Sequence, residues 1–317
     1  MSFAFVFPGQ GSQSVGMLAA LSSADPIVRA TFDEASSVLG YDLYQLVQEG
    51  PEDRLNSTER TQPAMLAAGI ATWRLWEKRG GGAPSAVAGH SLGEFTALTC
   101  AGALEFKTAI DLVQFRGQVM QEAVAPGAGA MAAIRGLEEA VLGEACREAA
   151  QGAVVEMVNF NAPGQIVIAG DMAAVQRAVD VAKAKGAKRA VALPVSVPSH
   201  SSLMKPAAER FAVKLAATEI TKPRIRYVSA VDAKDYNEPQ TIRELLGRQL
   251  ASPVRWPETV RALTGPGVAQ LIECGPGKVL TGLNRRIERR PDLQVLSLDD
   301  VAALDAALAA VQGAAHV

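Results

Sequence analysis

The segment that most constrains the fold is a tight turn, Gly89-His90-Ser91-Leu92-Gly93, between a predicted strand and a predicted helix. The strand ends near Ala88, and the stretch from Glu94 to Ala103 has good helix formers and no proline. Two glycines let the backbone turn sharply, and G-x-S-x-G in this setting projects the serine above the edge of a sheet. The turn therefore predicts an α/β fold with Ser91 as a nucleophile. The alternative is a structural turn in which Ser91 only caps the helix.

Strand and helix patterns also alternate along most of the rest of the chain. Strands are predicted near residues 3–7, 226–229, 268–273 and 294–296, and helices near 61–78, 106–123, 202–217 and 301–310. This alternation is typical of an α/β domain in which helices cover a sheet.

Residues 131–193 follow a different order: strand, helix, strand, strand, helix, strand. The predicted elements are 131–134, 137–149, 154–158, 166–169, 172–185 and 189–193. This is the order of the ferredoxin-like split βαβ unit. We therefore expect a ferredoxin-like subdomain at 127–194, inserted into a large α/β domain made of residues 1–126 and 195–317.

The composition limits the classes of protein to which the chain can belong. Its 317 residues, 49% of them apolar, suffice for a sizeable core. A net charge of −2 gives no sign of the basic surface that nucleic acid binding needs. No apolar run reaches the roughly 18 residues of a membrane span, and the first residues lack the pattern of a signal peptide. The three cysteines lie far apart and indicate neither disulfides nor a zinc site, so we expect a soluble, cytoplasmic protein without a metal.

A serine hydroxyl needs a base to act as a nucleophile, and histidine is the usual one. The chain has three histidines, at positions 90, 200 and 316. His316 lies in the terminal tail, and His90 adjoins Ser91 on a turn where neighbouring side chains diverge. His200 is therefore the candidate base, and the alternative is a loop histidine or a helix cap.

One charged side chain, Arg116, falls on the apolar face of the predicted helix 106–123. It shares a stripe at helical spacing with Ala109, Leu112, Val113, Val119, Met120 and Ala123. A buried guanidinium is costly unless a carboxylate meets it, and its planar fork suits bidentate binding. From the residues alone, an internal salt bridge is the expected interaction, for example to Glu94.

Further motifs lie in order along the chain. They are FPGQGSQ at 7–13, TQPA at 61–64, NFNAPGQ at 159–165, PSH at 198–200 and ECGPGK at 273–278. Together with the nucleophile turn, they make the whole sequence closely resemble the malonyl-CoA:acyl carrier protein transacylases. The resemblance implies an α/β-hydrolase-like core with a ferredoxin-like insert, in agreement with the pattern of predicted elements.

The resemblance also implies catalytic roles for five residues. Ser91 is acylated and His200 is its base. Gln249, in the segment 247–253, offers its backbone carbonyl to the histidine where a hydrolase usually has a carboxylate. Gln10 and the amide of Leu92 form the oxyanion hole.

Five more residues are implied to bind the substrate: Arg116, Met120, Asn159, Asn161 and Ser199. Arg116 holds the free carboxylate of the malonyl group, and Met120 lines the acyl pocket. Asn159 and Asn161 lie near the acyl-thioester and the pantetheine arm. Taken alone, Met120 is nearly as well explained as a core residue, and the two asparagines as a strand end.

By resemblance, the reaction is a ping-pong transfer of malonyl from coenzyme A to Ser91 and then to the phosphopantetheine thiol of acyl carrier protein. It would supply extender units for fatty-acid or polyketide synthesis, and it needs no cofactor beyond the coenzyme A thioester. We expect a monomer. Two alternatives remain at this point: a serine esterase or thioesterase, in which water finishes the reaction, and a non-catalytic module that binds a carrier protein.

Overall fold

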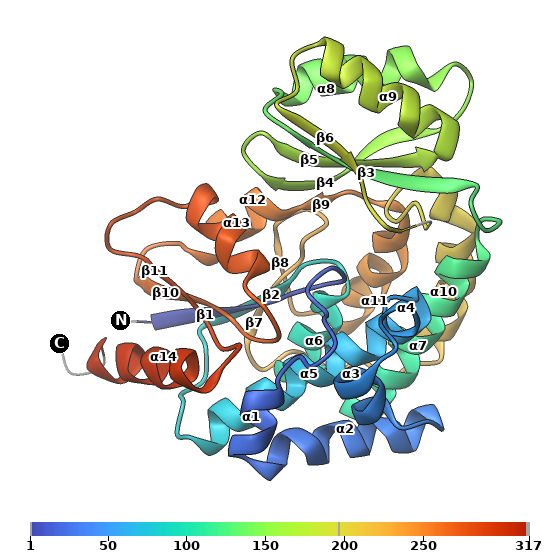
Figure 1. Ribbon diagram of the computed structural model, residues 1–317. Coiled ribbons are helices and arrows are strands. Elements are labelled where there is room, and N and C mark those ends of the chain that lie inside the picture. Colours follow the sequence, from blue (N-terminus) through green and yellow to red (C-terminus); the bar gives the residue numbers. More distant parts are fainter. Residues whose placement is uncertain (1, 196, 315–317) are drawn as a thin grey trace.

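A six-stranded, mostly parallel sheet forms the centre of the larger part of the molecule (Figure 1). The structure is a computed structural model that describes residues 2–195 and 197–314. The strand order is β11-β10-β1-β2-β7-β8, with the bounds β1 Ser2–Phe7, β2 Ala86–Gly89, β7 Arg226–Val228, β8 Asp235–Tyr236, β10 Val268–Glu273 and β11 Gln294–Ser297. All neighbouring pairs are parallel except β7 and β8. The carboxyl ends of the parallel strands therefore meet at one edge, where ligands bind in sheets of this kind.

Both faces of this sheet are buried. Because side chains alternate along each strand, a single strand contributes to the core on either face. In β1, Phe3, Phe5 and Phe7 join the larger hydrophobic core, whereas Ala4 and Val6 join the smaller core on the other face. The larger core includes residues of α5 (Thr58–Lys78), α6 (Gly93–Cys100) and α7 (Phe106–Glu122). The smaller core includes residues of α12 (Trp256–Leu263) and α13 (Val279–Ile287).

The larger part of the molecule has further helices besides α5, α6, α7, α12 and α13. They are α1 (Ala19–Ala24), α2 (Pro26–Leu39), α3 (Leu43–Glu49), α4 (Glu52–Leu55), α10 (Lys205–Ala216), α11 (Pro239–Arg248) and α14 (Val301–Ala314), with 3-10 turns η1 (Ser202–Met204) and η2 (Gln249–Ala251). The sequence analysis did not identify α1 to α4. For α2 the signals are local: the Asp25 carboxylate accepts the Ile27 N–H at its start, and Gly40 ends it with a positive φ of 74°.

A second sheet carries the ferredoxin-like pattern (Figure 1). Its elements follow in the order β3 (Gly129–Arg135), α8 (Glu139–Ala150), β4 (Val155–Ala162), β5 (Gln165–Asp171), α9 (Met172–Ala184) and β6 (Arg189–Ala192). The spatial order is β6-β3-β5-β4, all antiparallel, and the two helices share one hydrophobic core with the sheet. The predicted fold class, an α/β core with a ferredoxin-like subdomain, is confirmed.

One strand of the second sheet comes from outside the predicted insert. β9 (Val254–Arg255) pairs in parallel with β4, with Asn159 opposite Val254. The domain boundaries at 127–194 stay a prediction. The predicted helix 202–217 begins as the 3-10 turn η1 before α10 continues it. None of the helices in the described ranges is both long and apolar enough to cross a membrane.

Candidate functional site

Ser91 lies at the turn between β2 and α6, at the carboxyl edge of the central strands. Its φ of 53° falls in the left-handed region, which residues other than glycine rarely adopt. Two close backbone approaches require the flanking glycines. A Cβ on Gly89 would lie 1.8 Å from the carbonyl carbon of Gly93, and one on Gly93 would lie 2.1 Å from the carbonyl oxygen of Phe7. The turn therefore holds the serine in a strained conformation, as functional residues often are.

The Ser91 hydroxyl is hydrogen-bonded to His200. The distance from Ser91 Oγ to His200 Nε2 is 2.8 Å. On the other side of the ring, Nδ1 lies 2.9 Å from the carbonyl oxygen of Gln249 and 3.1 Å from that of Ser252. Because carbonyl oxygens only accept, Nδ1 carries the proton and Nε2 presents its lone pair to the serine O–H. His200 thus has the tautomer and the direction of a general base.

The environment keeps the His200 ring neutral. Burial lowers the pKa of His200 to about 3, and the positive charge of Arg116 also lowers it, whereas the hydrogen bond to the carbonyl of Gln249 acts in the opposite direction. The backbone of His200 is also held, with φ at 68° and its N–H donating to the Leu250 carbonyl at 3.0 Å. The turn η2 therefore positions both the main chain and the ring of this residue.

The backbone amides of Leu92 and Gln10 are candidates for binding an oxyanion. Both residues line the same cavity as Ser91, and neither amide donates a hydrogen bond within the part of the chain that the structure describes. Leu92 directly precedes α6, where the helix dipole favours negative charge. The Gln10 loop is fastened by Gln13, which accepts the Gly11 N–H at 2.7 Å and donates to Asn56 Oδ1 at 2.8 Å.

Arg116 is buried on α7, as its place in the apolar stripe predicted, with 1% of its surface exposed. Its Nη1 donates to Gln62 Oε1 at 2.9 Å, and its Nη2 donates to Gln249 Oε1 at 2.9 Å and to Ser91 Oγ at 3.1 Å. Burial lowers the pKa of Arg116 to about 10, so it stays charged near neutral pH. The salt bridge to Glu94 that the residues alone suggested is not formed, because the side chain of Gln249 lies between the two groups. Among the described residues, no carboxylate lies within 4.0 Å of the guanidinium.

Gln62 is a site residue that the sequence analysis did not assign. It belongs to the TQPA segment at the start of α5 and is buried beside Arg116. Its Nε2 lies 3.5 Å from the sulfur of Met120, which lines the cavity. The local signals were its place in the TQPA motif and in a predicted helix, directly before Pro63. Its contact with a residue 54 positions away was not visible in the sequence.

The structure separates the two asparagines of the NFNAPGQ segment. Asn159 lines the cavity, and its Oδ1 is buried without a hydrogen-bond partner among the described residues. Asn161 is not among the lining residues, and its Oδ1 lies 2.9 Å from Nε2 of His90, which does line the cavity. Ser199 lines the cavity next to His200. The substrate-binding roles of these residues stay predictions.

A cavity of about 420 Å³ brings these groups together. Of the residues predicted from sequence, it is lined by Gln10, Ser91, Leu92, Arg116, Met120, Asn159, Ser199 and His200. The structure adds Gly11, Gln13, Glu52, Asn56, His90, Met131, Leu193, Pro194, Val195 and Val197. Because Met131 and Asn159 belong to the second sheet, the cavity lies between the two sheets.

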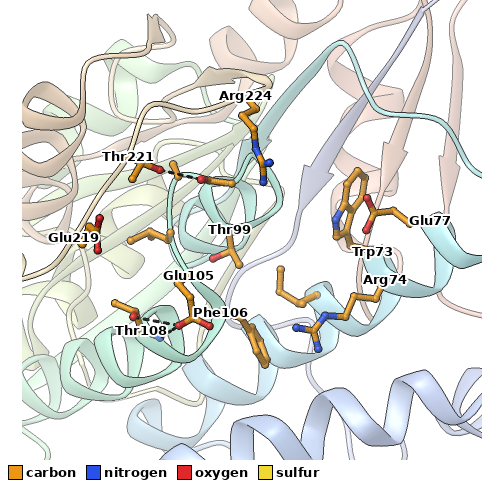
Figure 2. A pocket seen from close by; sticks show the side chains of 14 residues that line it. Trp73, Arg74, Glu77, Thr99, Glu105, Phe106, Thr108, Glu219, Thr221 and Arg224 are labelled. Atoms are coloured by element: carbon orange, nitrogen blue, oxygen red, sulfur yellow. Dashed lines mark hydrogen bonds between the residues drawn. The ribbon is translucent and has the colours of Figure 1, made fainter.

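A second cavity, of about 490 Å³, lies between α5, the start of α7 and the segment before β7 (Figure 2). Its polar residues already have internal partners in part: Arg74 donates to Glu34 at 2.7 Å, and Glu105 accepts the Thr108 N–H at 2.8 Å. No histidine, serine or cysteine lines it. The larger of the two cavities therefore lacks a nucleophile paired with a base, and the candidate active site is the cavity at Ser91.

Within residues 2–195 and 197–314, no group of three or more histidine, cysteine and acidic side chains is arranged to hold a metal ion. The prediction that the protein uses neither a metal nor a cofactor stays a prediction.

Enzymes that form acyl-serine esters use a serine hydroxyl paired with a neutral histidine and backbone amides that can bind an oxyanion. The cavity at Ser91 contains such a set of groups. The acyl transferase domain family matches residues 4–311, which is nearly the whole chain. The chain belongs to this family.

Individual relatives narrow the comparison. The chain is 55% identical to the malonyl CoA-acyl carrier protein transacylase of Escherichia coli O157:H7, over 96% of this chain and 98% of that protein. It superimposes with a TM-score of 0.93 on an acyl carrier protein S-malonyltransferase from Vibrio cholerae, 56% identical, covering 97% of this chain and 100% of that chain. A malonyl-transacylase solved in complex with a type II polyketide synthase acyl-carrier protein gives a TM-score of 0.95 at 56% identity, covering 97% and 99%.

Proposed function

We propose that this protein transfers malonyl groups from malonyl-CoA to the phosphopantetheine thiol of an acyl carrier protein, through an ester on Ser91. The observation that carries the proposal is the position of Arg116. Its buried guanidinium has no carboxylate partner among the described residues, and Nη2 lies 3.1 Å from the nucleophilic oxygen. In a malonyl thioester a single methylene separates the carbonyl from the free carboxylate. A guanidinium beside Ser91 can therefore bind the carboxylate while the carbonyl faces Oγ.

The first half of the reaction forms the ester. His200 Nε2 takes the proton of the Ser91 hydroxyl as Oγ attacks the thioester carbonyl of malonyl-CoA. The amides of Leu92 and Gln10 stabilise the negative charge on the carbonyl oxygen. When the tetrahedral intermediate collapses, the carbon–sulfur bond breaks and His200 returns its proton to the leaving thiolate of coenzyme A.

The second half reverses these steps with a different thiol. The phosphopantetheine thiol of the carrier protein gives its proton to His200 and attacks the carbonyl of the malonyl-serine ester. The bond from that carbonyl to Oγ then breaks, and Ser91 recovers the proton from His200. Since a thiol replaces a thiol, no water and no redox group takes part.

The partners of the reaction follow from the relatives named above. The complex of a malonyl-transacylase with its carrier protein supports an acyl carrier protein as the acceptor. The product would be an extender unit for fatty-acid biosynthesis. We place the protein in the cytoplasm, in keeping with three free cysteines, and we expect it to act as a monomer.

The test is intact-protein and peptide mass spectrometry after mixing with malonyl-CoA. We expect a malonyl group on the peptide that contains Ser91, and none in the Ser91→Ala variant. That substitution removes only a hydroxyl at a turn, so the variant should fold, which circular dichroism can check. Adding carrier protein should then move the label to its phosphopantetheine. Release of free malonate without transfer would instead identify a thioesterase, and acylation of Ser91→Ala would reject the nucleophile.

A further inference from the structure

Glu94 is a buried carboxylate to which the reaction above gives no role. It lies in the first turn of α6, three residues after Ser91, and is 1% exposed. Its Oε1 accepts the Tyr227 O–H at 2.8 Å and the Ala230 N–H at 2.6 Å. Its Oε2 accepts the side-chain N–H of Gln249. Every one of these partners is a donor, so the local geometry fits a carboxylate whose two oxygens only accept.

The side chain of Gln249 connects Glu94 to the active site. Its Nε2 donates to Glu94 and also to the carbonyl oxygen of Ser91 at 3.0 Å, while its Oε1 accepts from Arg116 Nη2. The two ends of an amide are not interchangeable, because one end donates and the other accepts. Turned over, the amide would present its NH2 to the guanidinium and its oxygen to two acceptors. The hydrogen bonds of Glu94 therefore decide which end of Gln249 faces Arg116.

We propose that Glu94 is a positioning residue for malonyl selection, which holds the guanidinium of Arg116 beside Ser91 through the amide of Gln249. The donors from Tyr227 and Ala230 fix the carboxylate, the carboxylate fixes the amide, and the amide oxygen binds Nη2. This inference rests on the proposed function, because it concerns how Arg116 meets the malonyl carboxylate.

The indirect connection has an advantage over a direct salt bridge. A carboxylate in contact with Arg116 would occupy the fork and compete with the carboxylate of the substrate. With an amide between them, no described carboxylate occupies the guanidinium and its Nε–H has no acceptor among the described residues, while both buried charges have a counter-charge nearby. Burial lowers the pKa of Arg116, and the charge of Glu94 partly offsets that effect. Glu94 thus supports the charged form of the guanidinium without taking its place.

The test is the variant Glu94→Gln, with kcat/KM measured for malonyl-CoA and for acetyl-CoA and the same carrier protein as acceptor. Tyr227 and Ala230 are both donors, so the oxygen of the introduced amide should take the place of Oε1 and accept from them. The NH2 of the introduced amide then faces the NH2 of Gln249. Because two donors cannot bond to each other, the amide of Gln249 should turn over and present its NH2 to Arg116. We expect malonyl transfer to fall roughly 10- to 100-fold, as for other small misplacements of a positioning group. Acetyl transfer, which does not use the fork, should change by about threefold or less.

Two further variants keep this result interpretable. Tyr227→Phe removes one donor to Glu94 but leaves its bond to Gln249, so the malonyl-to-acetyl ratio should stay within about twofold of wild type. Gln249→Met removes the amide but keeps the main-chain carbonyl that His200 uses. It should lower the malonyl-to-acetyl ratio by itself, whatever it does to the acetyl rate, and adding Glu94→Gln should then lower the ratio no further. If Glu94→Gln does not fold, Gln249→Met still decides the inference, because Glu94 is proposed to act only through that amide: a lowered ratio supports the inference and an unchanged ratio overturns it.

Several outcomes would overturn the inference. They are an unchanged ratio in Glu94→Gln or in Gln249→Met, equal losses of malonyl and acetyl transfer, and a Tyr227→Phe variant as selective as Glu94→Gln. A wild-type protein that transfers no malonyl would reject the proposed function together with the inference. An active wild type whose Glu94→Gln variant keeps its ratio would reject the inference alone.

Discussion

The two groups that contact the Ser91 hydroxyl are held in different ways. On one side, His200 is oriented by main-chain carbonyls, including that of Gln249. On the other side, Arg116 is oriented by the side-chain amides of Gln62 and Gln249. A main-chain carbonyl survives every side-chain substitution that preserves the backbone, whereas a side-chain amide is lost with its residue. We therefore expect the orientation of His200 to depend on the main chain and that of Arg116 to depend on a few side chains. Substitutions should then change the acylation rate and the preference for malonyl over acetyl independently.

The largest effect should come from the side of the base. His200→Ala removes the proton acceptor but leaves the amides of Leu92 and Gln10 and the guanidinium in place. We expect malonyl-CoA to bind and Ser91 to be acylated roughly 10²- to 10⁴-fold more slowly, with the same factor for acetyl-CoA. Rapid-quench mass spectrometry of the ester measures both rates. An unchanged acylation rate would exclude His200 as the general base. A loss confined to malonyl would show that His200 affects substrate choice and would contradict the difference drawn between the two sides.

Arg116→Ala should lower malonyl transfer far more than acetyl transfer. Losing a charge-assisted contact in a partly dehydrated site should cost malonyl transfer about 2–5 kcal/mol in kcat/KM. Acetyl transfer should lose little or gain, because acetyl has no carboxylate and a buried charge has been removed. Steady-state kinetics with the two thioesters on folded protein gives the ratio. Parallel losses with a lower melting temperature would show that Arg116 is structural instead.

Gln62→Met should give a smaller change of the same kind. Methionine keeps the length of the side chain but removes the acceptor of Arg116 Nη1, leaving Nη2 on Gln249. The loss in malonyl kcat/KM should be about 1.5 kcal/mol, typical of one hydrogen bond to a charged group. Acetyl kinetics provide the control within the same variant. An acetyl loss as large as the malonyl loss would place Gln62 among the residues that shape the cavity as a whole.

The smallest effect concerns the dependence of the acetyl reaction on pH. The neutral form of His200 is the active one, and both burial and the charge of Arg116 lower its pKa. In Arg116→Ala one of these causes is gone, so the pKa rises and the ring becomes protonated at a higher pH. The acid limb of kcat/KM for acetyl-CoA should therefore move to higher pH than in wild type. A limb that stays in place would mean that the two sides of Ser91 are electrostatically independent, and a limb that moves to lower pH would contradict the expected direction of the coupling.

Much of the fold could be predicted from the sequence because its signals are local. The strand at Ser2–Phe7, the turn at Ser91 and the six elements between residues 129 and 192 follow from periodicity and glycine or proline punctuation. The strand β9 could not be predicted in this way. Two residues carry no periodicity, and their pairing with β4 depends on contacts between segments about a hundred residues apart.

The site shows the same limit. Ser91 followed from its turn, His200 from the scarcity of histidines, and Arg116 from a stripe on one helix. The direction of the Arg116 fork did not follow, because it depends on Gln249 lying between Arg116 and Glu94. Glu94 and Gln249 are 155 positions apart, and no local pattern reports such a contact. The expected salt bridge was wrong for this reason.

Among the residues that the structure describes, Arg116 has no carboxylate partner, and this has a consequence for the stability of the protein itself. A buried charge without a counter-ion raises the free energy of the folded state more than a hydrogen-bonded buried ion pair does. Under the proposed function, the carboxylate of a malonyl ester on Ser91 would complete such a pair, and only the folded chain can form it. The malonylated protein should therefore resist heat better than the acetylated or the unmodified protein. For the lifetime of that ester, the malonyl group would then contribute to the stability of the fold in the same way as a buried side chain of the protein.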